Sequence, residues 1–177
     1  MKKLSSLELE RPELADIGGI RRIPIVVVLD NVRSGLNVGS IFRTADAFAI
    51  EKVILTGITQ TPPHREILKT ALGSTDSVSW EFDFSGTEAL NTLKREDYIL
   101  VAVEQTNESI PLNSFKFEKD QKYALILGNE VEGISDQVLE LVDMAVEIPQ
   151  AGIKHSLNVS VCGGIIMWEA VRQLSEK

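Results

Sequence analysis

Three loops of this 177-residue chain combine amide, carboxylate and guanidinium side chains with glycine, and such loops can bind a ligand and move a proton. The first loop, residues 31–48, reads NVRSGLNVGSIFRTADAF and carries Asn31, Arg33, Asn37 and Arg43 around the expected start of a helix. Free N–H groups and the helix dipole favour an anion there, so the loop is suited to phosphate or carboxylate recognition. Taken singly, the residues also fit a simpler interpretation, in which Asn37 caps the helix and Arg43 is solvated.

The second loop, residues 125–135, reads LILGNEVEGIS and places Gly128 and Gly133 on either side of Glu130 and Glu132. It lacks the Lys-Ser/Thr pair of a phosphate-binding P-loop, and its two carboxylates would repel a triphosphate unless a metal intervened. Glycine permits close backbone approach, so main-chain groups here could hold adenine and the ribose hydroxyls of a neutral or cationic ligand. A glycine turn with a solvated glutamate explains the glycines equally well.

The third loop belongs to IPQAGIKHSLNVSVCGGIIMWEA, residues 148–170, where Ser156, Asn158 and Ser160 stand at the start of an apolar helix. We predict that helix over about 156–174. One cap is enough for one helix, and Ser or Asn inside a first turn competes with helix hydrogen bonding. Capping explains most of the segment, but the surplus of polar side chains indicates a site.

The elements that must position these loops alternate along the chain. Apolar, β-branched runs predict strands at 23–30, 52–57, 98–104, 123–128 and 145–149, with a strand or sheet edge at 77–84. Helical spacing of apolar residues predicts helices at 38–48, 63–72, 87–95, 136–142 and 156–174. This order predicts an α/β domain with a mainly parallel sheet and helices on both faces. Ligands in such sheets bind beyond the carboxyl ends of the strands, where the three loops lie.

Length and composition favour one domain, because 44% of the residues are apolar and no linker or repeat divides the chain. We expect a short N-terminal extension over 1–22 and the domain over 23–177. The chain has no apolar run of about eighteen residues and no apolar core behind its first lysines, so we expect a cytoplasmic protein without membrane contact.

The net charge of the chain and its small numbers of cysteine and histidine argue against two classes of function. The net charge of −8 argues against non-specific binding to nucleic acid, although it does not exclude a nucleic-acid enzyme, because arginines gather in the first quarter of the chain. Cys162 is the only cysteine, and His64 and His155 are the only histidines. These numbers argue against a metal site, and we interpret Cys162 as a small buried residue rather than a nucleophile.

Taken together, the three loops resemble the signature motifs of the SpoU (TrmH-like) branch of the SPOUT RNA methyltransferases. NVGSIFRTADAF is similar to the first motif of the branch, LILGNEVEGIS to the second, and the segment 148–170 to the third. The order and spacing agree, and the resemblance runs from about Ile23 to the C-terminus. The chain departs from the pattern at Ser34, where many relatives carry Asp, and at Cys162, where Ala is common. Neither position belongs to the functional residues of the motifs, so we expect little effect.

The resemblance implies a deep trefoil knot near the C-terminus, a homodimer, S-adenosylmethionine (SAM) bound in the knot, and methyl transfer to a ribose 2′-hydroxyl of tRNA or rRNA, with tRNA slightly favoured. It implies no metal. Carried over by position, the cofactor contacts come from Val103, Leu127, Gly128, Ile148, Ser156 and Leu157. The catalytic region contains Arg43, Asn37, Glu130, Ser156 and Asn158. In this assignment Asn37, Ser156 and Asn158 orient Arg43 and the ribose, and Glu130 fixes the second-motif turn or an arginine.

The role of Arg43 stays open between two accounts. The family assignment makes it the base, helped by the substrate phosphate, yet a guanidinium is nearly always protonated. In the alternative, Arg43 clamps the phosphate beside the target ribose, and water or the phosphate takes the proton.

Two questions stay open, namely which other residues contact RNA and whether the protein has a different function. His64, Arg65 and Lys69 could contact RNA or form a solvated helix face, and we expect His155 to face the surface or the substrate. A knotted RNA-binding protein without methyl transfer is the main functional alternative. A doubly wound nucleotide-binding enzyme is disfavoured, because the G-x-G-x-x-G glycines are absent.

Overall fold

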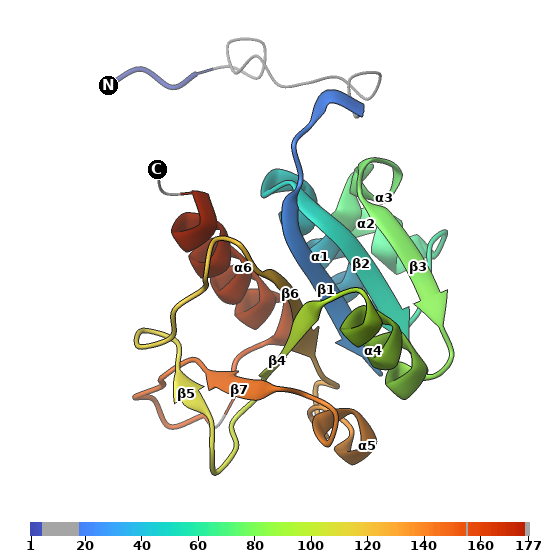
Figure 1. Cartoon of the computed structure of the whole chain (residues 1–177). Coiled ribbons are helices and arrows are strands. Elements are labelled where there is room, and N and C mark those ends of the chain that lie inside the picture. Colours follow the sequence, from blue (N-terminus) through green and yellow to red (C-terminus); the bar gives the residue numbers. More distant parts are fainter. Residues whose placement is uncertain (5–17, 155, 176–177) are drawn as a thin grey trace.

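The computed structural model describes residues 1–4, 18–154 and 156–175. In this part of the chain the strands form one seven-stranded sheet in the order β3-β2-β1-β6-β4-β7-β5, and every pairing is parallel (Figure 1). The strands are β1 (Ile23–Asp30), β2 (Ile50–Thr56), β3 (Ser79–Asp83), β4 (Tyr98–Val103), β5 (Ile110–Pro111), β6 (Lys122–Leu127) and β7 (Met144–Glu147). The prediction of an α/β fold with a mainly parallel sheet is confirmed.

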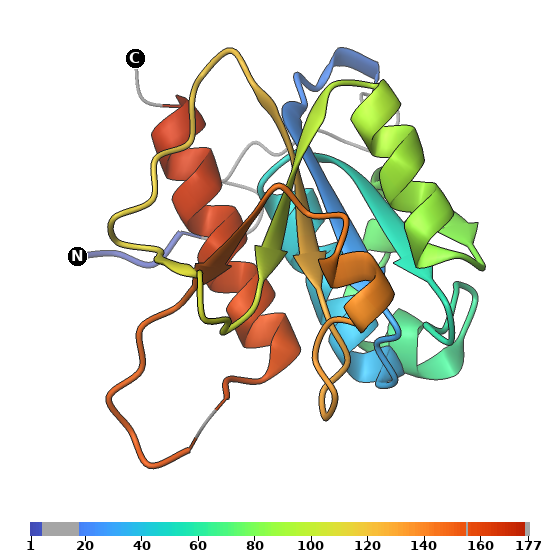
Figure 2. The same ribbon diagram turned by 60° about the horizontal axis from the view of Figure 1, so that its bottom comes forward.

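Helices cover both faces of this sheet, as predicted. They are α1 (Gly35–Ala47), α2 (Arg65–Ala71), α3 (Ser74–Ser77), α4 (Gly86–Arg95), α5 (Asp136–Leu139) and α6 (Val159–Ser175). One apolar cluster joins alternate residues of β1, such as Val27, to α1, α2 and α6, and a second joins Val26 and Val28 to α4 and α5. Figure 2 shows α4 and α5 in front of the sheet and α1 behind it. Burial on both faces explains why β1 reads as an unbroken apolar run.

Helices α1 and α6 each start three residues away from the predicted position. Helix α1 begins at Gly35, and its N-cap is Ser34, whose hydroxyl accepts the Asn37 N–H. Helix α6 begins at Val159 rather than near Ser156, because the Asn158 side chain accepts the N–H groups of its first turn. The expectation that Asn37 caps α1 is therefore wrong, and Ser156 and Asn158 precede α6 instead of lying within it.

Little of the proposed N-terminal extension falls within the described part of the chain. Strand β1 starts at Ile23, and the Arg22 guanidinium donates a hydrogen bond to the Ser77 carbonyl oxygen at 2.7 Å, next to β3. Residues 5–17 lie outside the described residues. The boundary between extension and domain stays a prediction.

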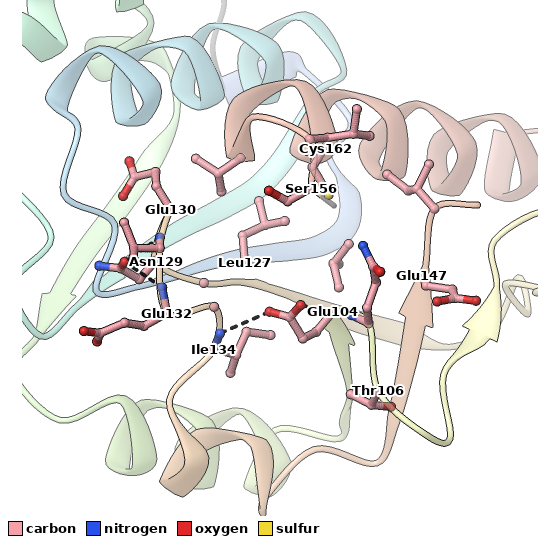
Figure 3. A pocket seen from close by; sticks show the side chains of 18 of the residues that line it. Glu104, Thr106, Leu127, Asn129, Glu130, Glu132, Ile134, Glu147, Ser156 and Cys162 are labelled. Atoms are coloured by element: carbon pink, nitrogen blue, oxygen red, sulfur yellow. Dashed lines mark hydrogen bonds between the residues drawn. The ribbon is translucent and has the colours of Figure 1, made fainter. Parts of the chain in front are cut away.

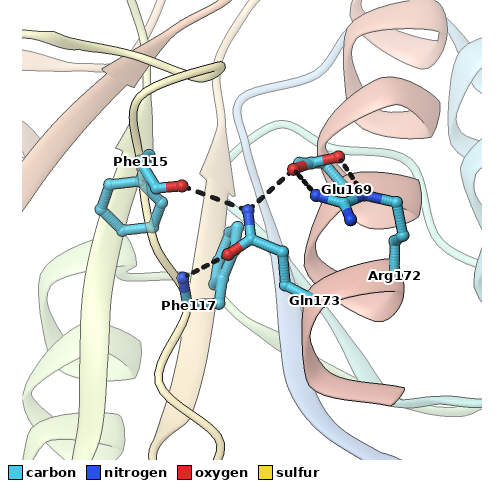
Figure 4. Close-up of polar contacts among 5 residues, drawn as sticks. All are labelled: Phe115, Phe117, Glu169, Arg172 and Gln173. Carbon is cyan, nitrogen blue, oxygen red and sulfur yellow. Dashed lines mark hydrogen bonds and ion pairs between the residues drawn. The ribbon is translucent and has the colours of Figure 1, made fainter. Parts of the chain in front are cut away.

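Gln173 ties α6 to the connection between β5 and β6 (Figure 4). Its Oε1 accepts the Phe117 N–H at 2.9 Å, and its Nε2 donates to the Phe115 carbonyl at 3.1 Å and to Glu169 Oε1 at 2.7 Å. Arg172 pairs with the same Glu169 carboxylate at 2.7 Å. The side chain thus satisfies two backbone groups of a segment that has no sheet partner there, and it fixes the chain that enters β6.

We expect Gln173→Ala to lower the free energy of unfolding by about 1–3 kcal/mol, because it leaves the partly buried Phe117 N–H and Phe115 carbonyl without their partner. Urea unfolding followed by circular dichroism measures the change. Gln137→Ala, at an exposed position of α5, is the matched control and should change stability by less than about 0.5 kcal/mol. Equal effects of the two substitutions would contradict this role of Gln173.

Candidate functional site

A pocket of about 660 Å³ opens at the carboxyl ends of β4, β6 and β7, beside the segment that leads into α6 (Figure 3). This volume is typical of a small-molecule site. All six residues expected to contact a cofactor line it: Val103, Leu127, Gly128, Ile148, Ser156 and Leu157. The structure thus places the second and third motifs around one cavity, at the edge of the sheet that the alternation of elements predicts.

The turn after β6 forms one wall and depends on its two glycines. Asn129 and Gly133 exchange backbone hydrogen bonds at 2.9 and 3.0 Å, and Gly133 has a φ of 73°. A Cβ at Gly128 would lie 2.2 Å from the Gly133 carbonyl carbon, so no side chain fits there. The Asn129 side chain accepts the Val131 N–H at 2.8 Å and donates to the Asn31 carbonyl at 2.8 Å, which fastens the turn to the end of β1.

Glu130 lies at the N-terminus of α1 and is not a solvated turn residue. Its carboxylate accepts the backbone N–H groups of Arg33 and Ser34, each at 3.0 Å, and the Asn37 side-chain amide at 2.9 Å. The anion expected at the start of this helix is therefore the protein's own carboxylate. Glu130 fixes the first-motif loop through backbone groups and contacts the main chain of Arg33 rather than its guanidinium.

The hydrogen bonds to Glu130 change its acidity. Burial by itself would raise the pKa of the carboxyl, but the hydrogen bonds from Arg33, Asn37 and Ser34 outweigh burial and hold the pKa below its ordinary value. The charged form is therefore the one that the fold stabilises.

A second amide bond joins the third motif to this arrangement. The Asn158 Nδ2 donates to Asn37 Oδ1 at 3.1 Å, and the Asn158 Oδ1 accepts the Ser160 N–H at 2.9 Å and the Ser160 hydroxyl at 2.6 Å. Asn158 thus caps α6 and contacts the first motif at the same time. Ser160 takes part only in the cap, whereas Ser156 is exposed and lines the pocket.

Ser34 and Cys162, the two positions at which the chain departs from the motif pattern, both lie at the site. Ser34 caps α1 and donates its N–H to Glu130, and Cys162 lines the pocket. Burial, followed by the negative charge of Glu104, raises the pKa of the Cys162 thiol to about 11. The thiol stays protonated at neutral pH, which agrees with a small packing residue rather than a nucleophile.

Arg43 is the one predicted catalytic residue that the structure separates from the pocket. It is exposed on α1, about two turns after Asn37, and it is not among the residues that line the cavity. No hydrogen bond or ion pair joins its guanidinium to another described residue. The other four, Asn37, Glu130, Ser156 and Asn158, line the cavity or bond directly to its walls.

Sequence reasoning missed two carboxylates at strand ends. Glu104 follows β4 and accepts the Ile134 N–H at 3.2 Å and the Gln105 N–H at 3.0 Å inside the pocket. Asp30 ends β1, is 2% exposed, and accepts the Ser135 N–H at 2.9 Å. A charged residue directly after an apolar strand is the signal that could have identified both.

Comparison with known protein families identifies the family to which the chain belongs. The model of the SpoU rRNA Methylase family matches residues 24–168. The chain belongs to this family. Within it, the chain is 31% identical to the tRNA (guanosine(18)-2'-O)-methyltransferase of Aquifex aeolicus over 97% of its own length and 80% of that protein.

Other relatives are longer than this chain. It is 33% identical to the tRNA (guanosine(18)-2'-O)-methyltransferase TARBP1 of Mus musculus, matching 96% of the chain but 11% of that protein. It is 34% identical to the 23S rRNA (guanosine-2'-O-)-methyltransferase RlmB of Ralstonia nicotianae, over 96% of the chain and 66% of the relative. The similarity to these two therefore concerns one part of a longer protein.

Solved structures of the family share the fold. The Aquifex aeolicus TrmH/SpoU tRNA modifying enzyme superposes with a TM-score of 0.80 at 28% identity, covering 92% of this chain and 81% of that one. The SpoU methyltransferase AviRb of Streptomyces viridochromogenes, solved in complex with the cofactor AdoMet, gives a TM-score of 0.78 at 29% identity, over 87% and 59% of the two chains.

Residues 1–4, 18–154 and 156–175 contain neither a candidate metal cluster nor a helix that could span a membrane. In these residues no group of three or more His, Cys, Asp and Glu side chains is arranged to hold a metal ion. None of the helices described there has the length and apolar character needed to cross a bilayer.

We expect Gly128→Ala to destabilise the protein by at least about 2 kcal/mol, since the added methyl overlaps the backbone of Gly133. Gly164→Ala is the matched control: its Cβ meets nothing within 4 Å, and Ala in a helix is favoured by about 0.5–1 kcal/mol. Thermal unfolding of both variants measures the difference. A Gly128→Ala protein as stable as the wild type would disprove the packing argument.

Glu130→Gln should lower stability at neutral pH by on the order of 1 kcal/mol, because the charged acceptor of Arg33, Ser34 and Asn37 is lost. The folded pKa of Glu130 lies below the ordinary value of 4.5, so its contribution is present above that value and is lost as the pH falls through the folded pKa. Urea unfolding of wild type and variant at neutral and acidic pH measures how their difference changes.

The difference between the two proteins should shrink on acidification. Glu132→Gln, an exposed residue of the same turn, controls for the loss of charge and should show little effect at either pH. A wild-type advantage over Glu130→Gln that is independent of pH would rule out the charged hydrogen-bond acceptor as its source.

Proposed function

We propose that this protein transfers a methyl group from SAM to a ribose 2′-hydroxyl of RNA, with tRNA slightly favoured over rRNA as the substrate. The observation that carries the proposal is the hydrogen-bonded chain Glu130–Asn37–Asn158, which holds the three motif loops together beside the pocket. Membership of the SpoU family and the names of the relatives, which include ribose methyltransferases acting on tRNA and on rRNA, support it.

The pocket has the chemistry that SAM requires. Leu127, Ile148 and Leu157 offer apolar contacts, and the absence of a side chain at Gly128 exposes the backbone to a bound ligand. Carboxylates dominate the charged lining, which suits a cation. When bound, the cofactor supplies a methyl group made electrophilic by its sulfonium, and no metal is needed for that chemistry.

The protein's own part in the reaction is to position the RNA and to help remove a proton, because a ribose hydroxyl is a weak nucleophile while it keeps its proton. Asn37, Ser156 and Asn158 would orient the ribose next to the pocket. Arg43 would bind the adjacent phosphate. Its exposed position favours the clamp over the base, since guanidinium groups stay protonated and a solvated one is free to meet a phosphate.

The outward face of α6 supports the proposed homodimer. Val161, Ile165 and Trp168 recur at helical spacing and are 50%, 37% and 55% exposed. An exposed apolar stripe on a helix is typical of a protein interface. The proposed trefoil knot rests on the family resemblance. Its support here is that Ile148, Leu157 and Asn158, which precede α6, line the same pocket as the ends of β4 and β6.

Basic residues on α2 offer a further RNA contact. Arg65 and Lys69 are exposed there. His64 has a structural explanation instead, because its Nδ1 accepts the Glu66 N–H at 3.4 Å and caps the helix. His155 lies outside the described residues, and its proposed surface role stays a prediction, as does the cytoplasmic location.

The alternative function is RNA binding without methyl transfer. Such a protein would keep the knot and the cofactor pocket, and the complete set of Asn37, Arg43, Glu130, Ser156 and Asn158 favours the enzyme over it. Calorimetry distinguishes both of these functions from that of a dinucleotide-binding enzyme. We expect the protein to bind SAM and not NAD.

We expect Arg43→Ala to reduce methyl transfer at least about 100-fold, with SAM affinity changed less than about twofold, because Arg43 lies outside the cofactor pocket. Transfer of labelled methyl from SAM to tRNA or rRNA transcripts measures the activity, and calorimetry measures the affinity.

Arg95→Ala is the control for the loss of an exposed arginine, because Arg95 lies on α4 at the opposite face of the sheet. Its activity should equal that of the wild type. Wild-type activity in Arg43→Ala would refute the assigned role of Arg43, and a wild-type protein that does not bind SAM would refute the proposed function.

A further inference from the structure

Glu104 is a carboxylate inside the proposed cofactor pocket that the proposed reaction does not use. It follows β4, and Figure 3 shows its side chain between Leu127 and Ile134. Two backbone N–H groups, those of Gln105 and Ile134, donate to it at 3.0 and 3.2 Å and hold it in place. Gly133 makes room for it, because a Cβ there would lie 2.5 Å from the Glu104 Oε2. The protein therefore builds a fixed position for this carboxylate.

The negative charge of Glu104 is not neutralised by the side chains that line the pocket. The lining contains five carboxylates, those of Glu104, Glu130, Glu132, Asp136 and Glu147. No lysine or arginine belongs to this lining, and within the described residues no cationic side chain lies within 4 Å of Glu104. The pocket therefore has a negative electrostatic potential, which favours a cationic ligand.

Glu104 is better placed to act on the ligand than three of the other four carboxylates, Glu130, Glu132 and Asp136. Glu132 and Asp136 are exposed, so water screens them, and the Glu130 carboxylate is already engaged by three hydrogen bonds toward α1. Glu104 is partly buried, and its charge reaches the inner wall, where it adds to burial in raising the pKa of the Cys162 thiol.

This field matters because methyl transfer changes the charge of the cofactor. SAM carries a sulfonium, an ammonium and a carboxylate, with a net charge of +1, whereas its product S-adenosylhomocysteine (SAH) has a neutral sulfur and no net charge. The S–CH₃ electron pair stays on sulfur, the methyl group forms the new C–O bond, and the ribose proton leaves to solvent. An acidic pocket therefore holds the two forms with different strength.

We propose that Glu104 is a specificity-determining residue that makes the pocket favour the cationic methyl donor over its neutral product. This inference rests on the proposed function and adds to it a physical basis for product release. Glu104 acts through charge, so any ligand of the same shape with a positive charge near the sulfur position is favoured in the same way.

Calorimetry with three ligands tests the inference. They are SAM, SAH and sinefungin, an analogue in which a protonated amine replaces the methylated sulfonium. The wild type should bind SAM and sinefungin about fivefold more tightly than SAH, the upper end of the range for one solvent-screened charge contact. In Glu104→Gln the three affinities should agree within about twofold, mainly through weaker binding of the two cations.

Two further variants test whether the effect of Glu104→Gln comes from the lost charge at this position and not from a change in structure. Glu104→Asp keeps the charge and should retain the preference for cations. Glu140→Gln removes an exposed carboxylate outside the pocket and should leave the preference unchanged. Circular dichroism establishes that each variant is folded before its affinities are compared.

The outcomes separate the inference from the proposed function. Equal binding of SAM and SAH by the wild type overturns the inference and leaves the methyltransferase proposal standing. Equal weakening of all three ligands in Glu104→Gln also overturns it, because Glu104 would then act by neutral hydrogen bonding. Failure of the wild type to bind any of the three overturns the proposed function itself.

Discussion

The geometry of the site depends on one carboxylate at the start of a helix. Glu130 accepts the N–H groups of Arg33 and Ser34 and the amide of Asn37, so it neutralises the positive end of α1 and joins β6 to the chain after β1. Asn37 can then offer its Oδ1 to Asn158. Without the carboxylate, three donors would lose their acceptor and the third motif would lose its contact with the first.

The parallel sheet brings these distant residues together. Strand β6 lies between β1 and β4, so the turns after all three strands open at the same edge. The end of β7, next to β4, adds a further wall to the pocket formed by the ends of β4 and β6. Gly128 and Gly133 then allow the turn after β6 to close tightly enough for Asn129 to reach Asn31. Strand order therefore provides proximity, while the short polar contacts provide orientation.

Much of this could be predicted from the sequence. The β-branched run at 23–30 identified the central strand, and the second and third motif loops identified the pocket, because both signals are local. The N-cap of α1 could not be predicted, since Asn37 is a good cap in isolation but bonds to Glu130, 93 residues away. The position of Glu104 opposite Ile134 likewise depends on strand order. The two-residue strand β5 and the four-residue helix α3 are too short to show a period.

The position of the transferred methyl group is the most direct test of the account. Unmodified tRNA and rRNA transcripts would be incubated with the purified protein and SAM carrying a deuterated methyl group, digested to nucleosides and examined by mass spectrometry. The account predicts the label on the ribose of a 2′-O-methyl nucleoside. Label on a nucleobase, or RNA that is bound but never labelled, would contradict it.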